Sequence, residues 1–419
     1  MRKPSLLRGS LLGDDHPSFA AIKEARNEVH KKTDRMELNN LSERRRIDQF
    51  YRNVDANLKL MGALRMGQRN VWVRLSRYAA QSNLIEPELR AILARITGLG
   101  SWYPSWAERA QHFEELGQEA VAREHFRTAA DYLLTAALLF HYAQIHTRPE
   151  SALKAEGSQH CFRCYRQGAP WFDPPAERLD LPSENAELPG YLRRPRGVQR
   201  PPVVVLINGA NTSKEELHSW TEVFLRRGLA TVTFDGPGQG EMALRHGRSV
   251  FRAESYEHAV RTIFDWIGSH AQLNGERIAL WGISLGGLLA AQSAAQDGRV
   301  RAAVSIGGLY GFENYADLAV PTQEEMRDLA GLNTLSETED YFKRAYDPSH
   351  LGPVRCPFLV VHGALDEIVS TEDARRLADR AGNLGELWVF NDGVHCCYNL
   401  FQELRPRIAD WVADRLMAT

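Results

Sequence analysis

The sequence contains 419 residues, of which 43% are hydrophobic and 25% are charged. This length suits two domains, and the composition is that of an ordinary soluble globular protein. The 51 Lys and Arg residues nearly balance the 53 Asp and Glu residues, so the net charge of −2 gives no electrostatic reason to expect nucleic acid or an anionic membrane as a partner.

The first residues and the cysteines bear on where the protein works. Segment 1–12 carries basic residues but no apolar run of signal-peptide length, because Arg8, Gly9 and Ser10 separate its two Leu-Leu pairs. No uncharged apolar stretch approaches the roughly 18 residues that a membrane span needs. Five cysteines, an odd number in a long chain, do not look like a disulfide framework. We therefore expect a cytoplasmic protein.

Residues 1–170 have an almost wholly helical pattern. Segment 43–80 is rich in Arg, Leu, Met and Ala with apolar residues at helical spacing, and two further helical passes are predicted near 107–116 and 120–143. We expect a helical N-terminal or cap domain that roofs a pocket, forms a homodimer interface, or does both. Its aromatic cluster either packs in the core or lines an apolar pocket: Trp102, Tyr103 and Trp106.

From residue 171 the pattern changes to alternating strands and helices. Segments 178–182 and 188–194 predict a leading antiparallel pair of strands. Short apolar runs of the kind buried in parallel sheets follow at 203–207, 230–234, 278–281, 302–306, 358–361 and 387–390. Helices are predicted at 214–227, 255–267, 285–295, 371–381 and 401–416. We expect residues 171–419 to form an α/β domain with a mostly parallel, doubly wound sheet, roofed by extra helix from 311–351.

The segment Gly282-Ile-Ser284-Leu-Gly286 fits the pattern G-x-S-x-G. It directly follows the predicted strand 278–281 and opens an Ala-rich helix, which is where this motif must lie to be functional. Small flanking residues permit a sharp turn that projects the serine hydroxyl, and the helix N-terminus favours developing negative charge. The motif in this context predicts an α/β-hydrolase fold with Ser284 as nucleophile.

A carboxylate and a histidine follow in the chain order that this fold requires, Ser then Asp then His. Asp366 comes just after the predicted strand 358–361, and His395 comes just after 387–390, so both belong to loops at the carboxyl ends of strands. We expect His395 to act as general base and Asp366 to orient it. The alternatives are Glu367 or Asp392 for the carboxylate and His362 for the histidine.

An oxyanion hole needs two backbone N–H groups that point at the developing alkoxide. One is expected from Leu285, the residue after the nucleophile. The other is expected from the loop after strand 203–207, where Gly209 permits close approach and the N–H of Ala210 is the preferred donor. The turn Asp235-Gly-Pro-Gly-Gln-Gly240 lacks the pattern of a phosphate-binding loop, and we interpret it as a structural turn near the site.

Four stretches are distinctive: Asn211-Thr-Ser-Lys-Glu-Glu216, Phe234-Asp-Gly-Pro-Gly-Gln-Gly-Glu-Met242, Ser284-Leu-Gly-Gly287 and His395-Cys-Cys-Tyr-Asn399. Together they resemble the 2,6-dihydroxypseudooxynicotine hydrolase family over about residues 130–415. The resemblance implies an α/β hydrolase with a helical N-terminal domain and a Ser284, Asp366 and His395 triad. It also implies an additional acidic residue, for which Glu313 is our candidate and Asp317 the alternative.

Some members of that family hydrolyse carbon–carbon bonds in ketones, so the resemblance implies a small-molecule substrate that is a mid-sized ketone, β-diketone-like or aryl ketone compound. A carboxylesterase or lactonase would use the same residues, and a catalytically degenerate binding or scaffold protein is the third alternative. No cofactor is expected. No metal is expected either, because Cys161 and Cys164 have half of a zinc-ribbon spacing without a second pair.

Overall fold

The computed structural model describes residues 43–63, 86–148, 151–183, 186–245 and 250–418. The chain divides into two compact units, Met1–Tyr51 and Arg52–Thr419, and helix α2 (Glu43–Ala63) runs from the first into the second. The predicted helix 43–80 is confirmed as far as Ala63, and its remainder lies outside the described residues.

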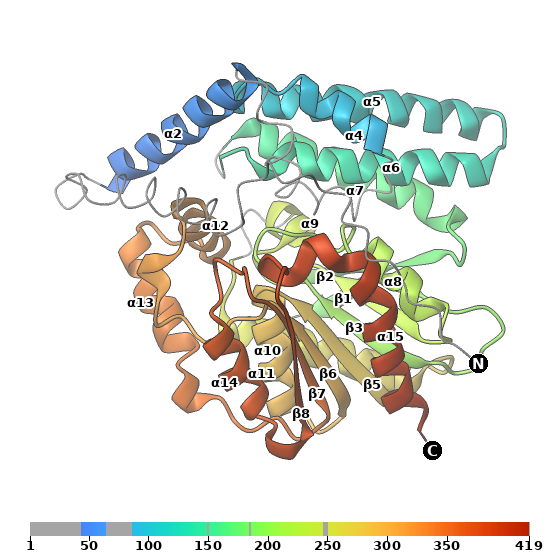
Figure 1. The fold of residues 1–419 in the computed structure, drawn as a ribbon. Coiled ribbons are helices and arrows are strands. Elements are labelled where there is room, and N and C mark those ends of the chain that lie inside the picture. The colour runs from blue at the N-terminus through green and yellow to red at the C-terminus, as the bar shows by residue number, and fades with distance from the viewer. Residues whose placement is uncertain (1–42, 64–85, 149–150, 184–185, 246–249, 419) are drawn as a thin grey trace, which may run out of the picture. The chain divides into compact units, whose positions relative to one another are not determined.

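In the second unit, the described residues between 86 and 168 form four α-helices (Figure 1). They are α4 (Glu86–Ala94), α5 (Leu99–Ala122), α6 (Phe126–Ile145) and α7 (Ala152–Gly168). Trp106 of α5, Leu133 of α6 and Tyr165 of α7 are buried in one shared core. The aromatic residues Trp102, Tyr103 and Trp106 belong to this core, which is one of the two alternatives that the sequence leaves open.

The break between α5 and α6 lies at residues 123–125, whereas the predicted segments place it at 117–119. Glu124 has a φ of 59°, in the left-handed region, and the N–H of His125 bonds to the carbonyl of Ala120 at 2.9 Å. This arrangement closes a helix C-terminus, where Gly or Asn is the usual residue. Because a glutamate occupies the position, the sequence carries no recognisable stop signal there.

Eight strands form one sheet in the order β1-β2-β4-β3-β5-β6-β7-β8. The strands are β1 (Ala176–Ser183), β2 (Ala186–Arg193), β3 (Pro202–Ile207), β4 (Ala230–Phe234), β5 (Asn274–Ile283), β6 (Val300–Ile306), β7 (Phe358–Gly363) and β8 (Gly385–Phe390). β1 and β2 pair antiparallel, β2 joins β4 antiparallel, and the remaining pairs are parallel. The predicted mostly parallel sheet with a leading antiparallel pair is confirmed.

Helices cover both faces of the sheet, which is why the parallel strands are continuously apolar. On one face lie α10 (Ala253–Ser269), α11 (Leu285–Gln296) and α14 (Thr371–Asp379); on the other lie α8 (His218–Leu225) and α15 (Phe401–Met417). Successive strand residues point to opposite faces, so Val205 shares a core with Ile263 of α10, and Leu206 shares the other core with Trp220 of α8.

The predicted extra helix within 311–351 is present between β6 and β7. It consists of η3 (Tyr315–Asp317), α12 (Val320–Ala330), α13 (Leu335–Ala345) and η4 (Pro348–His350). Phe312, Phe342 and Tyr346 are buried there and join the core that also holds α10 and α11. This insertion is therefore packed onto the sheet domain by an aromatic cluster. The other short helices in the described ranges are η2 (Ala169–Trp171), α9 (Gly240–Arg245), η5 (Gly382–Leu384) and η6 (His395–Leu400).

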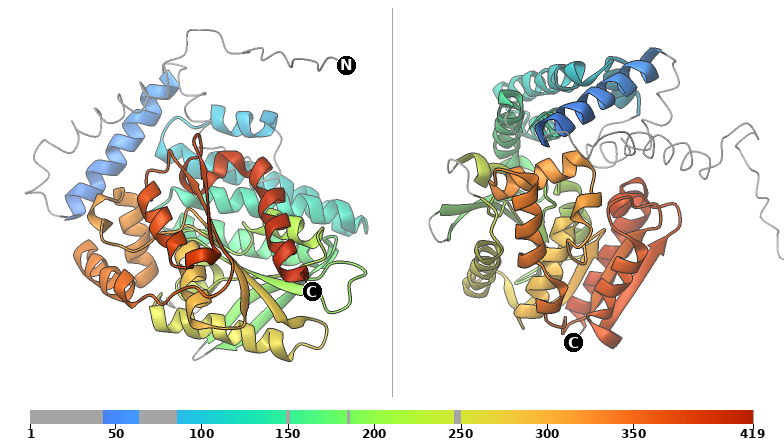
Figure 2. Two further views of the ribbon diagram at one scale, coloured as in Figure 1. Left: turned by 60° about the horizontal axis from the view of Figure 1, so that its bottom comes forward. Right: turned by 90° about the vertical axis from the view of Figure 1, so that its left-hand side faces the viewer.

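The helices α4 to α7 pack against the sheet part of the same unit. Ala176 of β1 and Tyr191 of β2 are buried in the core of those helices, and α7 contacts α9. In Figure 1 and in the right-hand view of Figure 2 these helices lie together on one side of the α/β part. The change from helix to strand at 171–176 agrees with the predicted boundary, whereas the division into domains 1–170 and 171–419 stays a prediction.

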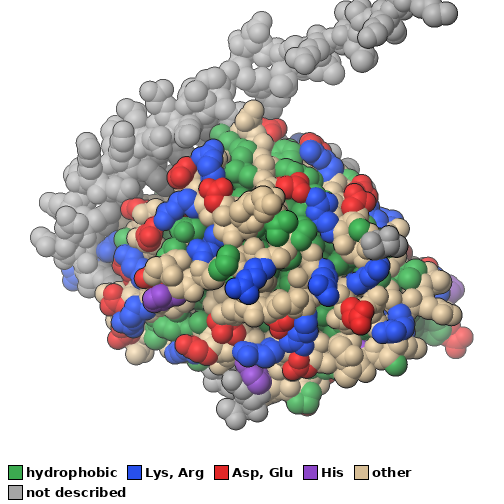
Figure 3. Space-filling view, turned by 90° about the horizontal axis from the view of Figure 1, so that it is seen from below, with side chains coloured by type: hydrophobic (Ala, Val, Ile, Leu, Met, Phe, Trp, Pro, Cys, Tyr) green, Lys and Arg blue, Asp and Glu red, His purple; other side chains and the backbone are tan. Residues whose placement is uncertain are grey.

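The face of the molecule seen from below in Figure 3 carries basic and acidic side chains interspersed with one another. On this face neither sign of charge gathers into a continuous patch, in agreement with the nearly balanced charge of the sequence. Among the helices that the structure describes, none combines the length and the apolar character needed to cross a bilayer.

Candidate active site

Ser284 lies at the tight turn between β5 and α11. Its backbone has a φ of 54° and a ψ of −123°, a left-handed conformation that is strained for a residue with a side chain. The turn is so close that a Cβ atom at Gly282 would lie 1.9 Å from the carbonyl oxygen of Gly286. Only glycine therefore fits at 282, and the local geometry is that of a nucleophile elbow.

The structure brings Ser284, His395 and Asp366 together. The Oγ of Ser284 lies 3.0 Å from the Nε2 of His395, and the Nδ1 of His395 lies 2.8 Å and 3.0 Å from the two carboxylate oxygens of Asp366. The Oδ1 of Asp366 also accepts hydrogen bonds from the N–H groups of Ile368 and Val369 at 2.8 Å and 3.0 Å. A hydroxyl, an imidazole and a fixed carboxylate thus form one hydrogen-bonded chain.

Burial and charge act in opposite directions on this histidine and this carboxylate. Burial opposes protonation of His395, but the charge and hydrogen bond of Asp366, together with those of Cys396, outweigh it and raise the pKa of the imidazole well above its ordinary value. Burial would likewise raise the pKa of Asp366, but the imidazole and the two N–H donors outweigh burial and lower it. The arrangement therefore favours an ionised Asp366 beside a strongly basic His395.

The residues that the sequence offers as alternatives to Asp366 and His395 lie outside this hydrogen-bonded chain. Asp366 is the carboxylate within hydrogen-bond distance of His395, whereas Glu367 and Asp392 are exposed. His362 is buried on β7 with its Nδ1 4.0 Å from the Oδ2 of Asp366, and its burial lowers its pKa. Burial in the sheet is consistent with its interpretation as a packing residue.

The predicted oxyanion donors flank the serine on two sides. Leu285 is the first residue of α11, where a helix N-terminus leaves N–H groups without intrahelical partners. Gly209 lies after β3, so near the elbow that a Cβ atom there would be 3.4 Å from the Cβ of Ser284. Ala210 follows in the same loop and is partly exposed. Both strand ends belong to one edge of the sheet, so the two donors can face a common point.

Gln239 is a residue at this edge to which the sequence assigns no role. Its Nε2 donates to the carbonyls of Gly209 and Asn208 at 2.9 Å and 3.2 Å. The turn that contains it lies beside the site, as the sequence predicts, but the contact joins residues thirty positions apart. The only feature of the sequence that could indicate this contact is that Gln239 is a polar residue in a turn otherwise made of Gly, Pro and one Asp.

Glu313, the candidate additional acid, is 59% exposed and forms an ion pair with Arg376 at 3.4 Å. The alternative, Asp317, is also exposed and ends η3. Glu313 borders a small hollow that also includes Ile368 and Val369, the residues whose N–H groups bond to Asp366. Glu313 therefore lies close to the triad. Its catalytic role stays a prediction.

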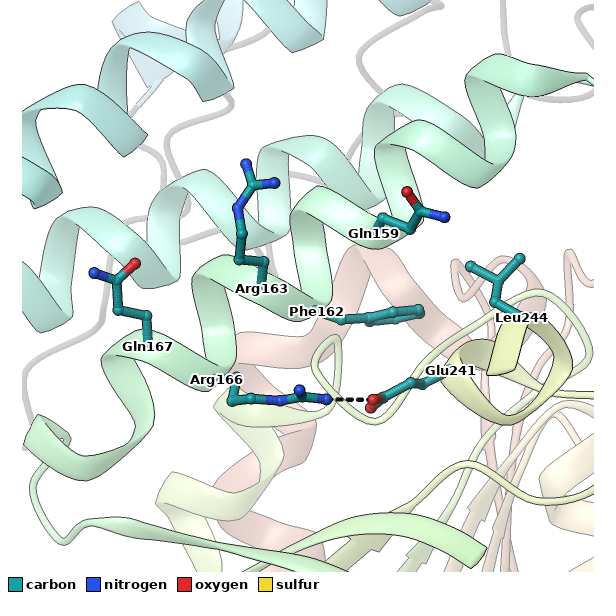
Figure 4. Close-up of a pocket in the computed structure, with 7 residues that line it drawn as sticks. All are labelled: Gln159, Phe162, Arg163, Arg166, Gln167, Glu241 and Leu244. Atoms are coloured by element: carbon teal, nitrogen blue, oxygen red, sulfur yellow. Dashed lines mark hydrogen bonds and ion pairs between the residues drawn. The ribbon is translucent and has the colours of Figure 1, made fainter. Parts of the chain in front are cut away.

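A larger cavity of about 490 Å³ lies between α7 and α9 (Figure 4). It is lined by Gln159, Phe162, Arg163, Arg166, Gln167, Glu241 and Leu244. None of these residues belongs to the triad. We therefore locate the candidate active site by the hydrogen-bonded triad and not by the volume of the cavity. In the part of the chain that the structure describes, no three His, Cys, Asp or Glu side chains are grouped to hold a metal ion.

Comparison with known proteins supports the same fold. A family model described as the alpha/beta hydrolase fold matches residues 202–332, which include the elbow and its two flanking elements. The crystal structure of 2,6-dihydroxy-pseudo-oxynicotine hydrolase matches with a TM-score of 0.73 and 29% identity, covering 81% of this chain and 95% of that one. The wild-type AbyA5 structure matches with a TM-score of 0.61 and 22% identity, covering 79% and 94%, which is a likeness of fold.

Among characterised sequences, the chain is 34% identical over 321 residues to 2,6-dihydropseudooxynicotine hydrolase of Paenarthrobacter nicotinovorans. That match covers 76% of this chain and 85% of the relative. It is also 30% identical over 232 residues to hydrolase acrC of Aspergillus aculeatus, covering 50% of this chain and 54% of that protein. The resemblance inferred from the four sequence stretches is confirmed, and the chain belongs to the α/β-hydrolase family that includes 2,6-dihydropseudooxynicotine hydrolase.

Proposed function

We propose that this enzyme is a serine hydrolase in which Ser284 attacks a carbonyl carbon, His395 is the general base and Asp366 orients the histidine. The observation that supports the proposal most directly is the hydrogen-bonded chain from the Ser284 hydroxyl through both ring nitrogens of His395 to Asp366. A serine hydroxyl alone is a poor nucleophile at neutral pH, and this chain supplies the base that it needs.

In the first half of the reaction, the Nε2 of His395 takes the proton of the Ser284 hydroxyl as Oγ bonds to the substrate carbonyl carbon. The resulting oxyanion is stabilised by backbone N–H groups, which we assign to Leu285 and Ala210. Collapse of this intermediate breaks the bond to the leaving group, which departs with the electron pair and receives the proton from the His395 imidazolium. An acyl-enzyme on Ser284 remains.

In the second half, a water molecule gives its proton to His395 and attacks the acyl carbon. The tetrahedral intermediate then releases a carboxylic acid, and the proton returns from His395 to the Oγ of Ser284. Each catalytic group ends in the state in which it began, so the cycle consumes one substrate and one water.

We propose a carbon–carbon bond in a ketone, β-diketone-like or aryl ketone as the bond cleaved. Membership of the 2,6-dihydropseudooxynicotine hydrolase family supports this choice. The departing carbon must then be stabilised as an enol or an electron-rich ring. A carboxylesterase or lactonase acting on a mid-sized ester would use the same groups with an oxygen leaving group, so substrate tests must separate the two.

Replacing the nucleophile tests the proposal at its centre. A fluorophosphonate probe is expected to label Ser284, identified by peptide mass spectrometry. Ser284→Ala is expected to abolish labelling and to lower kcat by roughly 10⁴–10⁶-fold, because it removes the hydroxyl proposed to form the acyl-enzyme. Ser269→Ala, at the far end of α10, is the control and should leave both unchanged. Turnover by Ser284→Ala near the wild-type rate would contradict the assignment.

A panel of β-diketones, aryl ketones and p-nitrophenyl esters tests the bond type. A carbon–carbon hydrolase should convert a diketone to one acid and one ketone with a higher kcat/KM than any ester of similar size. Preference for esters or lactones across the panel would instead support the carboxylesterase alternative. Absence of labelling and of turnover on every substrate would favour a binding or scaffold protein.

A further inference from the structure

The loop that joins β3 to α8 contains a run of polar side chains buried almost completely. The members that are at most 3% exposed are Asn208, Ser213, Lys214, Glu215 and Glu216. Loops normally run over the surface, and buried polar groups require partners. This loop also carries Gly209 and Ala210, the residues proposed to supply an oxyanion donor, so the partners of its side chains bear on catalysis.

The carboxylate of Asp235, at the end of β4, binds this loop at two points. Its Oδ1 accepts from the Nδ2 of Asn208 at 2.9 Å and from the backbone N–H of Lys214 at 2.8 Å. Gly209 and Ala210 lie between those two points. Its Oδ2 accepts from the Nζ of Lys214 at 2.7 Å and from the N–H of Glu241 at 2.9 Å. One fully buried carboxylate therefore fixes both ends of the oxyanion segment, residues 208–214.

Gln239 fixes the middle of the same segment. Its Nε2 donates to the carbonyls of Asn208 and Gly209, as described above. Its Oε1 accepts from the N–H of Gly236 and from the hydroxyl of Tyr256, both at 3.1 Å. Because two donors contact one end of the Gln239 amide, that end must be the oxygen and the other end the nitrogen. The side chain therefore has a single orientation. The peptide that precedes Ala210 is thereby held from outside the loop.

Lys214 balances the charge of Asp235 in a cluster that the helical part encloses. Its Nζ also lies 2.7 Å from Glu215 and 2.9 Å from Glu241, and it lies 4.7 Å from the ring centre of Phe162 on α7. Burial opposes the charge of Lys214, but the three carboxylates outweigh it and raise the pKa of the amine. The amine of Lys214 is therefore held in its charged form, while burial raises the pKa of Glu215, and Phe162 of α7 packs against the amine.

Glu241 connects this cluster to the cavity of Figure 4. It receives ion pairs from Arg166 of α7 and from Arg178 of β1, the latter at 2.8 Å. Burial would raise its pKa, but Lys214 and Arg178 outweigh burial and lower it to about 2. Lys214 contacts all three carboxylates, and Arg166 and Arg178 both contact Glu241, so the buried Glu241 charge is paired on more than one side.

The glycine-rich turn 235–240 is explained by this arrangement. Gly240 has a φ of 43°, and a Cβ atom there would lie 2.4 Å from the carboxylate of Asp235. The chain therefore folds back over Asp235 so closely that a side chain at 240 would displace it. The turn that looks like a mere connection in the sequence encloses the carboxylate and brings Gln239 to the loop.

We propose that Asp235 and Gln239 are positioning residues that hold the segment 208–214 so that its oxyanion donor faces Ser284, with Lys214 as the buried counter-ion. This inference rests on the proposed serine-hydrolase function. A donor that must meet charge in the transition state is effective only if it is fixed beforehand. Loosening the segment should therefore slow acylation without weakening the binding of the ground-state substrate.

The variant Gln239→Leu removes both bonds to the loop carbonyls and keeps the size of the side chain. We expect kcat to fall roughly 10- to 100-fold with KM within about twofold, since displacement of a catalytic group by about 1 Å costs on this order. The rate of labelling by a fluorophosphonate should fall by the same factor, and the labelled residue should still be Ser284. That second readout is independent of the natural substrate.

Thr221→Val is the matched control. It also removes two buried hydrogen bonds, from Arg193 at 2.8 Å and to the carbonyl of His218 at 2.6 Å, but on α8 and away from the oxyanion segment. Its kcat and labelling rate should equal those of the wild type at equal folded fraction. If Gln239→Leu has the same kcat and labelling rate as this control, the positioning role is wrong. As long as the probe still labels Ser284, that result leaves the proposed function intact.

Tyr256→Phe serves if Gln239→Leu does not fold. It deletes one of the two donors that orient the Gln239 amide and keeps the ring in the core. We expect a fall of several-fold in kcat and in labelling rate with an unchanged KM. An unchanged kcat would overturn the proposal. Wild-type turnover without any label on Ser284 would instead contradict the proposed function on which it rests.

Discussion

At the scale of single residues, the raised pKa of His395 has a direct kinetic consequence. The imidazole can accept the Ser284 proton only when it is neutral. The Asp366 carboxylate stabilises the protonated form, so a higher pH is needed to remove that proton than the ordinary histidine value of about 6.5. We therefore expect kcat/KM to rise with pH along a limb whose midpoint lies above that value, measured with a p-nitrophenyl ester in buffers of constant ionic strength.

Asp366→Asn should change this profile in two ways at once. Loss of the carboxylate removes the charge that raises the pKa of His395, so the limb should move to lower pH. The amide would also favour the wrong tautomer of the imidazole, and kcat should fall by about 10⁴-fold. Asp392→Asn is the control, because Asp392 is exposed and accepts the hydrogen bond of the Asn399 amide with its backbone carbonyl. A limb that stays in place in Asp366→Asn would show that the charge of Asp366 does not set the pKa.

These residue-level features could be predicted from the sequence to different degrees. Ser284, Asp366 and His395 each follow a recognisable apolar strand, so topology alone brings them to one edge of the sheet. Asp235 and Gln239 could not be assigned, because their partners in segment 208–214 lie 21 to 31 positions away and no pattern marks a buried hydrogen bond. Glu313 could be named from the resemblance, but its exposure and its pair with Arg376 depend on how the insertion folds.

At the scale of elements, the elbow shows what a strained turn requires. Gly282→Ala would place a methyl group 1.9 Å from the carbonyl oxygen of Gly286, so β5 or α11 must shift. We expect the free energy of unfolding to fall by about 2–5 kcal/mol, as for other severe steric changes at special backbone positions. Activity should fall with it, because the shift moves Ser284. Urea unfolding and ester hydrolysis measure the two effects.

Gly268→Ala is the matched control for that change. Gly268 lies near the end of α10, and a Cβ atom there meets no atom within 4 Å. Alanine is the better helix former, so stability should stay the same or rise by up to about 1 kcal/mol, with no change in activity. If Gly282→Ala were as well tolerated as Gly268→Ala, the tight elbow would not be a requirement of the fold.

Strands and turns were easier to predict than helix ends. The parallel strands are short apolar runs bounded by Gly, Pro and Asp, and the structure has them within a few residues of the predicted positions. The break between α5 and α6 escaped prediction because Glu124 adopts a conformation that normally identifies glycine. The sequence predicts a helix that begins at Lys214, but Lys214–Leu217 form a turn before α8, since the buried partners of Lys214 hold it outside the helix.

At the scale of the whole molecule, the helices α4 to α7 and the sheet share one compact unit, which predicts how the protein unfolds. Leu133 on α6 is fully buried, and its core includes Ala176 and Tyr191 of the sheet. Leu133→Ala should lower the free energy of unfolding by about 2–5 kcal/mol. Because the core is shared, we expect loss of helix signal in circular dichroism and loss of hydrolase activity to shift together to lower urea concentration.

The matched control is Leu153→Ala on α7, a residue that is 40% exposed and should change stability by no more than about 0.5 kcal/mol. If the helical part were a separate domain, Leu133→Ala would unfold it first, and the circular dichroism trace would show two steps. Activity would then be lost at the first step only if enclosure of the Lys214 cluster by α7 matters for catalysis. A single coincident transition instead means that the helices and the catalytic sheet fold as one cooperative body.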